Sequence, residues 1–329
     1  MAVGSAEVVV VTGAGGFIPG HVCAELVHRG ARVRALCRYT SHGGIGTLQA
    51  LAPEVRDAIE VTRGDVRDAE SAGDALRGAG AVIHAAAEIA VPYSQANPRA
   101  FFETNVLGSL NVAQAARRHG IRRLVHVSSS EVYGTARSVP ITETHPVAPR
   151  SPYAASKAGA DALMSSFHHS FGLPVAVVRP FNTYGPHQTA RALVPTVMTQ
   201  ALAGGPVRLG ALNPTRDLTF VTDTAAGLAD AVEAPGIEGE VIQLGTGREL
   251  SVREVVELVG ALLDRELEIR QEPERLRPAS SEVDRLLSDA SRAHERLGWT
   301  PRVAPEEGFR RTLEWLGRRP VEHPERYVT

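Results

Sequence analysis

The feature that most constrains the fold is a regular alternation of short apolar runs with longer helical patterns over the first half of the chain. The apolar runs predict strands at residues 7–13, 31–38, 58–66, 80–87, 122–130 and 174–182. Helical patterns fill the gaps, notably at residues 16–30, 100–120 and 152–172. Continuous apolar strands that alternate with helices are typical of a parallel sheet covered on both faces. We therefore expect an α/β fold, a doubly wound parallel sheet of the Rossmann type.

The second half of the chain follows a looser pattern. Loops with proline and glycine become frequent after Asn182, and further helices are predicted at residues 253–263 and 305–317. This predicts a smaller C-terminal α/β region that supplies substrate contacts. The predicted division assigns residues 1–181, together with about 217–245, to the large domain, and residues 182–216 and 246–329 to the substrate region.

Composition gives no electrostatic reason to expect binding to nucleic acid or to an anionic membrane, because 35 basic and 37 acidic side chains nearly balance. No stretch approaches the roughly 20 apolar residues that a membrane-spanning helix needs. The first 13 residues are interpreted as leading into a strand, not as a signal peptide. Cys23 and Cys37 are expected to be reduced thiols, which favours a cytoplasmic protein, with a disulfide as the alternative.

A glycine-rich turn, "VTGAGGFIPG" at residues 11–20, follows the first predicted strand and opens a helix. At such a junction, glycines let the backbone approach a pyrophosphate, which also meets the helix N-terminus. Gly13 and Gly16 fit this pattern, but Pro19 stands where the third glycine is usual and Gly20 follows one place later. Because proline is tolerated in a first helical turn, the helix is expected to form with slightly altered packing.

The choice of cofactor depends on the end of the second strand, where an acidic residue would bind the ribose hydroxyls of NAD. Cys37 and Arg38 stand there instead. Arg38 either pairs with the 2′-phosphate of NADP or is a solvated surface arginine. Asp65, after the third strand, either accepts a hydrogen bond from an adenine amine or only starts a turn.

A second motif, "SPYAASKAGAD", begins with Ser151 as a predicted N-cap and Pro152 at the first helical position. Tyr153 and Lys157 are four residues apart and share one face of the predicted helix. A lysine beside a tyrosine favours the phenolate and lowers its pKa, and a phenolate is a general base for a substrate hydroxyl. The position of this pair after the "VSSS" strand and the glycine turn strengthens the prediction that it is catalytic.

With these motifs, "HAAA", "NVLGSLNV", "SSSEVYG", "RPFNTYGP" and "TRDLTFVTD" resemble those of an extended short-chain dehydrogenase/reductase of the nucleotide-sugar epimerase/dehydratase type. The resemblance covers nearly the whole chain. It implies NAD or NADP, tightly bound and recycled, in the large domain, and a nucleotide sugar on the C-terminal region. It also implies that Ser129 orients the sugar hydroxyl, that Tyr153 is the base for its oxidation, and that Lys157 supports Tyr153 and binds the nicotinamide ribose.

The same resemblance implies a set of cofactor-binding residues along the carboxyl ends of the strands. They are Gly13, Gly16, Phe17, Ile18, Arg38, Asp65, Val66, Ala85, Ala86, Ala87, Asn105, Ser128, Tyr153, Lys157, Pro180 and Thr183. No metal is expected, because His84, His126 and His187 lack the spacing of metal ligands, and the first two are interpreted as packed strand histidines.

Glu131 bears on the reaction subtype. Epimerases of this type usually carry a small neutral residue there, whereas dehydratases need a base that removes the C5 proton after C4 is oxidised. In the dTDP-glucose dehydratases an aspartate precedes this glutamate and acts as the acid, and here Ser130 stands instead. Glu131 is therefore expected to act as base and then as acid, with Ser130 only forming a hydrogen bond. A UDP-glucuronate decarboxylase, a 4-epimerase and a catalytically silent NAD(P)-sensing protein are the alternatives.

A narrower resemblance, carried by "AEIAVPYSQANPRAFFETN" and "RPASSEVDRLLSD" among other stretches, is to bacterial 4,6-dehydratases of the legionaminic-acid type. Those enzymes act on UDP- or GDP-linked N-acetylglucosamine and are described as NAD-dependent, which moderates the argument from Arg38. The expected product is a 4-keto-6-deoxy sugar.

Several residues of the second half resemble the contacts that such enzymes make with their substrate. The expected set is Ser129, Asn182, Arg191, Val194, Arg208, Leu209, Arg216, Arg277 and Glu282. Guanidinium groups suit the diphosphate, which supports Arg216 and Arg277, although any isolated arginine is equally compatible with a surface role. The family resemblance also implies a homodimer in which helices 100–119 and 153–171 pair across a two-fold axis.

Overall fold

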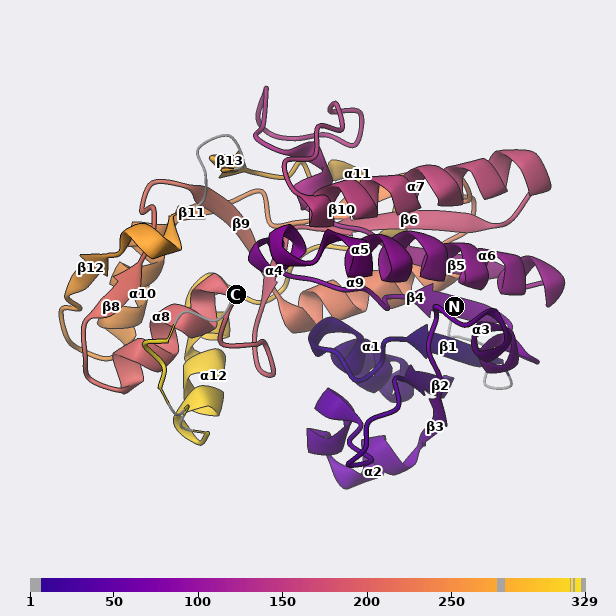
Figure 1. Ribbon diagram of the computed structural model, residues 1–329, viewed down its shortest axis with the longest axis horizontal. Coiled ribbons are helices and arrows are strands. Elements are labelled where there is room, and N and C mark those ends of the chain that lie inside the picture. Colours follow the sequence, from indigo (N-terminus) through magenta and orange to yellow (C-terminus); the bar gives the residue numbers. More distant parts are fainter. Residues whose placement is uncertain (1–6, 277–281, 320, 322, 327–329) are drawn as a thin grey trace.

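The computed structural model describes residues 7–276, 282–319, 321 and 323–326. It shows a large part built on one central sheet and a smaller part beside it, formed mainly by the last third of the chain (Figure 1). Within the described residues, the large sheet has seven parallel strands in the order β10-β6-β5-β4-β1-β2-β3. These strands are β1 (Val8–Thr12), β2 (Arg32–Cys37), β3 (Ile59–Arg63), β4 (Ala81–His84), β5 (Arg123–Val127), β6 (Val175–Pro180) and β10 (Val241–Leu244). The predicted doubly wound α/β fold is confirmed.

Helices cover both faces of this sheet, and every residue of β1, β5 and β6 is therefore buried. Such strands have no polar face, which is why they read as continuous apolar runs in the sequence. One face packs on α1 (Phe17–His28), α9 (Val221–Glu233) and α11 (Ser291–Leu297), and the other on α3 (Ala69–Leu76), α6 (Gly108–Arg118) and α7 (Pro152–Phe171). A 3-10 turn (Gly46–Ala50) and α2 (Pro53–Asp57) lie beside α1.

The helix predicted at residues 100–120 is not continuous. After α4 (Val91–Ala96), the chain forms α5 (Pro98–Phe101), a π-helical stretch (Phe102–Leu107) and then α6. The wider turn carries Asn105, whose side-chain amide is buried and bonded outside the helix. A π-helical turn inserts one extra residue, and such turns are frequent at functional sites.

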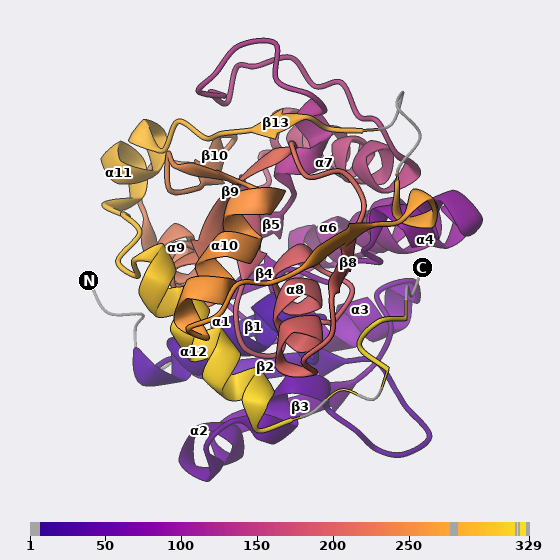
Figure 2. The same ribbon diagram turned by 90° about the vertical axis from the view of Figure 1, so that its left-hand side faces the viewer.

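The smaller part combines two small sheets with three helices, which Figure 2 shows in front of the large sheet. One sheet contains β7 (Asn182–Tyr184), β9 (Thr215–Phe220), β11 (Glu249–Ser251) and β13 (Arg285–Leu286), and the other pairs β8 (Val207–Leu209) with β12 (Ile269–Gln271). The helices are α8 (Leu193–Leu202), α10 (Val252–Leu262) and α12 (Pro305–Gly317), and 3-10 turns lie at Ser130–Tyr133 and Pro273–Arg275. A separate hydrophobic core, which includes Val197, Phe220 and Phe309, holds this part together.

The chain passes between the two parts more than once. β9 belongs to the smaller sheet, whereas α9 packs on α1 and β10 is the edge strand of the large sheet. The division of the chain into domains by ligand remains a prediction, and in the structure the chain rejoins the large sheet with α9.

Within the described residues, no helix has the length and apolarity that crossing a lipid bilayer requires. Cys23 and Cys37 are both free and buried, and burial raises the pKa of each thiol. Buried thiols of this kind behave as small apolar core residues.

Candidate active site

The glycine-rich turn brings the chain close to the loop that follows β4. Gly13 has φ 69°, and a Cβ there would lie 2.7 Å from the Cα of Ala86. Gly16 caps α1 without any side-chain hydrogen bond, which leaves the first-turn N–H groups of Phe17 and Ile18 without a side-chain cap. Bare helix N-termini bind phosphate through these groups and the helix dipole. The glycine-rich turn and the N-terminus of α1 therefore form a site that fits a dinucleotide pyrophosphate.

Pro19 is accommodated because it is the third residue of α1. The first N–H of the helix that is hydrogen bonded within the turn belongs to Gly20, which donates to the Gly16 carbonyl at 3.0 Å, so the missing N–H of Pro19 costs no helical bond. Close packing falls instead on Gly20, where a Cβ would lie 2.6 Å from Cγ2 of Thr47. The helix therefore forms as expected, and Gly20 provides the tight contact.

A chain of hydrogen bonds shapes the loop after β4. The Thr12 hydroxyl accepts the N–H groups of Ala85 (3.2 Å) and Ala86 (3.1 Å) and contacts Nδ1 of His84 at 2.8 Å. Since this hydroxyl already accepts two bonds, it donates its hydrogen to His84, and the Nε2–H of His84 then faces the Ser109 hydroxyl at 3.0 Å. His84 is thus a neutral structural histidine, and burial lowers its pKa well below the ordinary value.

Asn105 holds the far end of the same loop. Its Oδ1 accepts the Glu88 N–H at 2.8 Å, and its Nδ2 donates to the Glu88 carbonyl (3.0 Å) and the Ser156 hydroxyl (2.9 Å). Asn105 therefore ties the loop that contains Ala87 to α7. The structure brings Asn105 to the edge of the expected cofactor site, where its amide supports the backbone.

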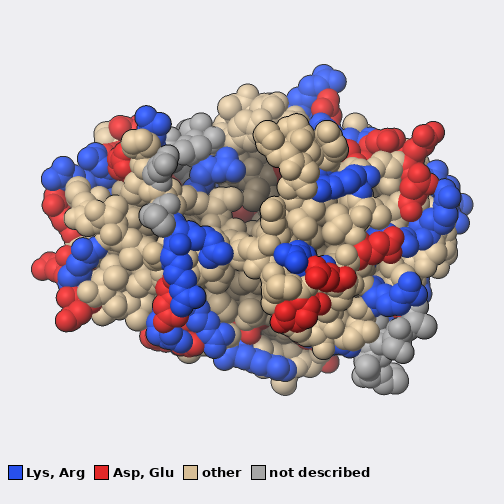
Figure 3. Space-filling model, turned by 90° about the horizontal axis from the view of Figure 1, so that it is seen from below, with Lys and Arg blue, Asp and Glu red and all other residues tan. Residues whose placement is uncertain are grey.

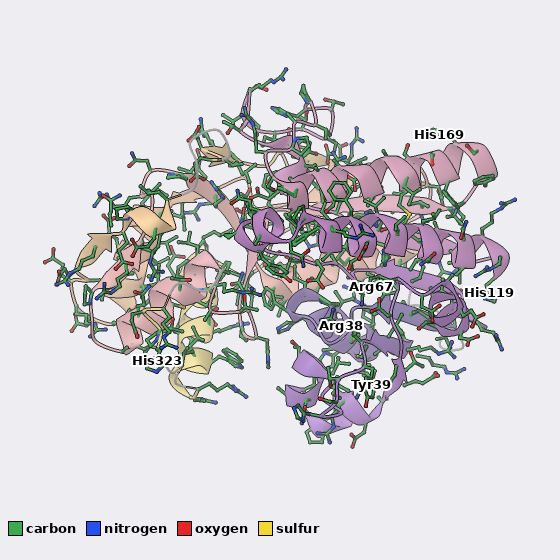
Figure 4. All side chains as sticks on the ribbon, in the orientation of Figure 1. Arg38, Tyr39, Arg67, His119, His169 and His323 are labelled. Carbon is green, nitrogen blue, oxygen red and sulfur yellow. The ribbon has the colours of Figure 1, made fainter. Side chains whose placement is uncertain are left out.

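Charged residues of both signs gather where β2 and β3 end, and Figure 4 shows Arg38, Tyr39 and Arg67 in this region. Arg38 pairs with Glu88 (Nη1 to Oε1, 3.2 Å), and Arg67 pairs with Asp65 (Nη2 to Oδ2, 2.6 Å). The bond to Arg67 is the main cause that lowers the pKa of Asp65. Val66, next to Asp65, is buried against α6. Both arginines are therefore paired with acidic partners.

The catalytic candidates begin where β5 ends. The Ser128 N–H donates to the Val178 carbonyl at 2.7 Å, and the Ser129 hydroxyl caps the following 3-10 turn by accepting the Glu131 N–H at 3.2 Å. Ser130 is buried, whereas Ser129 and Glu131 keep partial exposure. Because β5 is a central strand, this turn lies at the carboxyl edge of the sheet, where ligands of doubly wound folds bind.

Tyr153 and Lys157 lie in the first turns of α7, which Ser151 caps by accepting the Ala154 N–H at 3.1 Å, as predicted. Although part of the Tyr153 side chain is accessible, burial raises the pKa of its hydroxyl to about 12; a hydrogen bond with Ser129 opposes this, and Glu131 adds to it. The expectation that Lys157 lowers the pKa of Tyr153 is not met here. The Lys157 ammonium points to the Val127 carbonyl instead, at 2.6 Å.

The cofactor candidates Pro180 and Thr183 and the substrate candidate Asn182 lie at the neighbouring strand end. Pro180 is buried at the end of β6, and the Thr183 hydroxyl bonds with that of Thr224 at 3.0 Å. Among the described residues, no donor reaches the buried Oδ1 of Asn182. An unsatisfied buried polar atom is rare in folded proteins and fits a residue that awaits a ligand.

The arginines of the expected substrate set, of which Arg216 and Arg277 were expected at the diphosphate, differ in their surroundings. Arg216 is buried and lies 3.8 Å from the Glu282 carboxylate, so the structure brings these two candidates together. Arg208 pairs with Glu272 at 2.5 Å, and Arg191 is exposed before α8. Arg277 lies outside the described residues.

Val194 and Leu209, expected near the nucleotide base, are both buried in the hydrophobic core of the smaller part. The sequence pattern did not distinguish a core position from a site wall, since both are apolar. Figure 3 shows a hollow in the surface between the two parts of the molecule. No cluster of metal-ligating side chains occurs within the described ranges.

Three residues around the site were not predicted from the sequence. Gln188 donates to the Thr183 carbonyl at 2.8 Å, and Glu88 forms an ion pair with Arg38. Asp217 is fully buried and is next to Arg216 in the chain. Asp217 accepts bonds from Thr246, Gly247 and Ser288, which join three segments of the chain. The signal for Asp217 was an acidic residue in the "TRDLTFVTD" motif, and Glu88 directly follows the "HAAA" run.

Comparison with known proteins decides the family. The family model described as GDP-mannose 4,6 dehydratase matches residues 10–312. The chain belongs to this family. It is thereby an extended short-chain dehydrogenase/reductase of the nucleotide-sugar dehydratase/epimerase group, as the sequence motifs indicated.

Relatives of this GDP-mannose 4,6-dehydratase family member include both dehydratases and epimerases. It is 37% identical to the dTDP-glucose 4,6-dehydratase of Xanthomonas campestris pv. campestris, over 93% of this chain and 92% of the relative. It is 34% identical to the UDP-glucose 4-epimerase of Mycolicibacterium smegmatis, over 93% of this chain and 97% of the relative. The narrower resemblance to dehydratases of the legionaminic-acid type stays a prediction.

Solved structures of the family agree with this fold. The dTDP-glucose 4,6-dehydratase DesIV from Streptomyces venezuelae, crystallised as a double mutant with NAD bound, superposes with a TM-score of 0.86 at 33% identity. The match covers 94% of this chain and 97% of that chain.

Proposed function

We propose that this protein is a nucleotide-sugar 4,6-dehydratase that converts UDP-N-acetylglucosamine, or its GDP counterpart, to a 4-keto-6-deoxy sugar. The observation that carries this proposal is the position of Glu131. It stands two residues beyond Ser129 at the carboxyl end of β5, and its charge acts on the Tyr153 hydroxyl. A carboxylate at this place serves a reaction that needs a base beyond the one for alcohol oxidation.

The cofactor is proposed to be NAD, with NADP as the alternative. The N-terminus of α1, which has no side-chain cap, and the close approach of Gly13 to Ala86 fit the pyrophosphate. The related enzyme DesIV was solved with NAD bound. A bound dinucleotide supplies the oxidising equivalent at C4 and the reducing equivalent at C6. Arg38 favours NADP, but its pairing with Glu88 reduces the positive charge that a 2′-phosphate would meet.

The residues of the chain are proposed to move protons. Ser129 orients the C4 hydroxyl, and Tyr153 receives its proton in the phenolate form as C4 becomes a ketone. Burial favours the protonated phenol in the unliganded protein, and the positive charge of a bound oxidised nicotinamide would favour the phenolate. The ketone acidifies the C5 hydrogen, which Glu131 removes. The C6 hydroxyl then leaves as water with the proton that Glu131 returns, because the neutral Ser130 offers only a hydrogen bond. As C6 is reduced, C5 takes up a proton from Glu131 after solvent has protonated it again, and Tyr153 releases the C4 proton to solvent, so that the net change is the loss of one water.

The nucleotide part of the substrate is proposed to lie against β7, β9 and the segment that leads to β13. Asn182 and the pair formed by Arg216 and Glu282 would contact the diphosphate and the nucleotide ribose. The unsatisfied Oδ1 of Asn182 and the burial of Arg216 support this placement, since a buried guanidinium binds phosphate more strongly than an exposed one. Arg191 and Arg208 remain candidates at the rim.

A homodimer is also proposed, through the faces of α6 and α7. These helices pack side by side, and Leu107 (52% exposed) and Phe171 (49%) near their ends expose apolar surface. Exposed apolar side chains on neighbouring helices are a common basis for association. Light scattering after size exclusion tests this, because a monomer at micromolar concentration would contradict it.

A mass measurement distinguishes the candidate reactions. The purified protein is incubated separately with UDP-N-acetylglucosamine, its GDP counterpart, dTDP-glucose and UDP-glucuronate. Loss of one water supports dehydration and identifies the preferred nucleotide. Loss of carbon dioxide indicates a decarboxylase, and an isomer of unchanged mass indicates a 4-epimerase, the activity of the Mycolicibacterium relative. If no nucleotide sugar changes, the protein is better explained as an NAD(P)-sensing binding protein.

A further inference from the structure

Lys157 is the only lysine in the chain, and it is buried. Its ammonium donates to the Val127 carbonyl at 2.6 Å, the bond that anchors α7 to the end of β5. An ammonium in such a place needs a nearby negative charge, because burial without one favours the neutral amine. The source of that charge is therefore a functional question for the proposed active site.

Asp161 is one helical turn beyond Lys157 on the same face of α7. Its carboxylate is shared between two partners from neighbouring strands. Arg179 on β6 donates to Oδ2 through Nε (3.0 Å) and lies 2.9 Å from it through Nη2, and Nε2 of His126 on β5 lies 3.4 Å from Oδ1. Arg179 thus clamps the carboxylate, whereas Nε2 of His126 lies close to Oδ1 without forming a hydrogen bond.

Arg179 is itself held from the opposite direction. Its Nη1 donates to the Tyr133 hydroxyl at 3.0 Å, and that hydroxyl donates to Oε1 of Gln243 on β10 at 3.2 Å. The Arg179 guanidinium also lies over the Tyr133 ring, 5.0 Å from its centre. Since Arg179 is fixed by groups from two other segments, it cannot turn toward Lys157 or release Asp161 without breaking this network.

Each element that packs on Lys157 contributes titratable or charged groups to its surroundings. On α7 these are Tyr153 and Asp161, on β6 Arg179, on β5 His126 and on β4 His84, while Glu131 faces Tyr153. Burial lowers the pKa of both histidines, and the bond from Thr12 keeps His84 neutral. Asp161 is thus a buried anion that Arg179 contacts directly and whose charge also acts on Lys157, with which it forms no direct ion pair.

We propose that Asp161 is a positioning residue: held by Arg179 and flanked by His126, it keeps Lys157 in its ammonium form at the end of β5, and Arg179 limits how strongly it does so. The role of this ammonium in catalysis rests on the proposed function, but its protonation does not. Burial lowers the pKa of Lys157 to about 8, and Asp161 opposes that effect. The Asp161 and Arg179 pair also borders a cavity of about 310 Å³ between α7, β6 and β10.

A single lysine makes the test direct. Protein labelled with 13C at the lysine Cε gives one lysine signal, whose shift reports the protonation of Lys157 as the pH is raised. We expect a midpoint near 8 for the wild type. Asp161→Asn should lower the midpoint by about one pH unit or more, because the counter-charge is lost. Arg179→Gln should raise it by a similar amount, because Asp161 then serves Lys157 alone.

The opposite signs of the two variants distinguish a specific charge effect from a general loosening of the fold. The double variant, Asp161→Asn with Arg179→Gln, should lie between them, and Asp57→Asn on the exposed α2 should leave the midpoint unchanged. Folded variants that titrate like the wild type would overturn the proposal. A wild-type midpoint below 7 would also overturn it, even if every variant fails to fold. No substrate is present, so the result is independent of whether the protein is a dehydratase.

Discussion

The Ser129 hydroxyl accepts the backbone N–H of Glu131 at 3.2 Å, so one serine caps the turn that presents the glutamate. Ser129 therefore serves two purposes in the proposed mechanism, since it both faces Tyr153 and fixes the start of the turn. A capping serine is typically worth about 1 kcal/mol. The carboxylate of Glu131 is left free of that bond and available for chemistry.

Glu131→Gln should keep C4 oxidation and lose water formation. The amide preserves the shape of the turn but cannot take the C5 proton, and removal of a general base typically slows a step by about 10²- to 10⁴-fold. Mass spectrometry of the nucleotide sugar measures water loss, and deuterium exchange at C5 in D₂O measures proton removal. Glu54→Gln, on the exposed α2, is the matched control. Normal water loss in Glu131→Gln would contradict its role as base.

Ser130→Ala should slow water loss by less than about tenfold, because a neutral hydroxyl contributes one hydrogen bond. Ser130 is buried, so the methyl group of alanine fits the same space. The rate of the 4-keto product, followed at saturating substrate, measures the effect. A loss as large as that of Glu131→Gln would show that the serine, and not Glu131 alone, delivers the proton to the leaving hydroxyl.

Arg38 and Glu88 are expected to act in opposite directions on cofactor choice. Arg38→Ala should weaken NADP binding by about tenfold and leave NAD nearly unchanged, since a charge-assisted bond is worth about 1.5–3 kcal/mol. Glu88→Gln should tighten NADP binding, because it removes the carboxylate that pairs with Arg38 at 3.2 Å. Isothermal titration with each dinucleotide measures both. Equal affinities before and after both changes would make the pair a bystander.

Within the described residues, six of the seven strands of the large sheet and the Ser151 cap followed from local patterns, because periodicity and capping residues act within a few positions, whereas β10 was not predicted as a strand. What the sequence did not reveal depends on partners far along the chain. The π-helical turn at Asn105 forms where its amide reaches Glu88 and Ser156, and the Asp161 clamp needs Arg179 from another strand. Long-range contacts of this kind have no signature in a single segment.

The raised pKa of Tyr153 shows the same limit. The spacing of Tyr153 and Lys157 predicts a lowered pKa for the tyrosine, but spacing carries no information on burial, which is the dominant cause here. Similarly, Val194 in α8 and Leu209 in β8 lie in the core of the smaller part, and the sequence did not distinguish packing from binding there because both uses need apolar side chains.

His187 should make the free energy of unfolding fall as the pH is lowered. Burial is the main cause that lowers its pKa from 6.5 to about 4, with His21 and Arg319 adding to it. Between these values the unfolded chain binds a proton at His187 and the folded chain does not, so stability present above pH 6.5 is lost as the pH falls toward 4.

His187→Asn removes this titration and suits the local backbone, since φ is 71° and asparagine tolerates the left-handed region. The difference in unfolding free energy between wild type and variant, measured in urea at several pH values, should shift in favour of the variant below pH 6.5. Buried histidines away from this site, such as His84 and His126, titrate in both proteins and cancel, whereas His21 lies beside His187 and contributes to the measured difference. A difference that is constant with pH would contradict the assignment.

Asp217 should be among the most costly residues to change outside the catalytic set. It is fully buried, and its two oxygens accept five hydrogen bonds, from Thr246 N–H and hydroxyl, Gly247 N–H, and Ser288 N–H and hydroxyl. Asp217→Asn turns one acceptor oxygen into a donor that faces donors, so we expect a loss of about 3 kcal/mol or more in unfolding free energy. Asp284→Asn, exposed before β13, should cost little.

Because Asp217 neighbours Arg216 on β9, Asp217→Asn should also raise KM for the nucleotide sugar more than it lowers kcat. Urea unfolding and steady-state kinetics measure the two effects, and a variant as stable as the wild type would show that these bonds do not hold β9 in place.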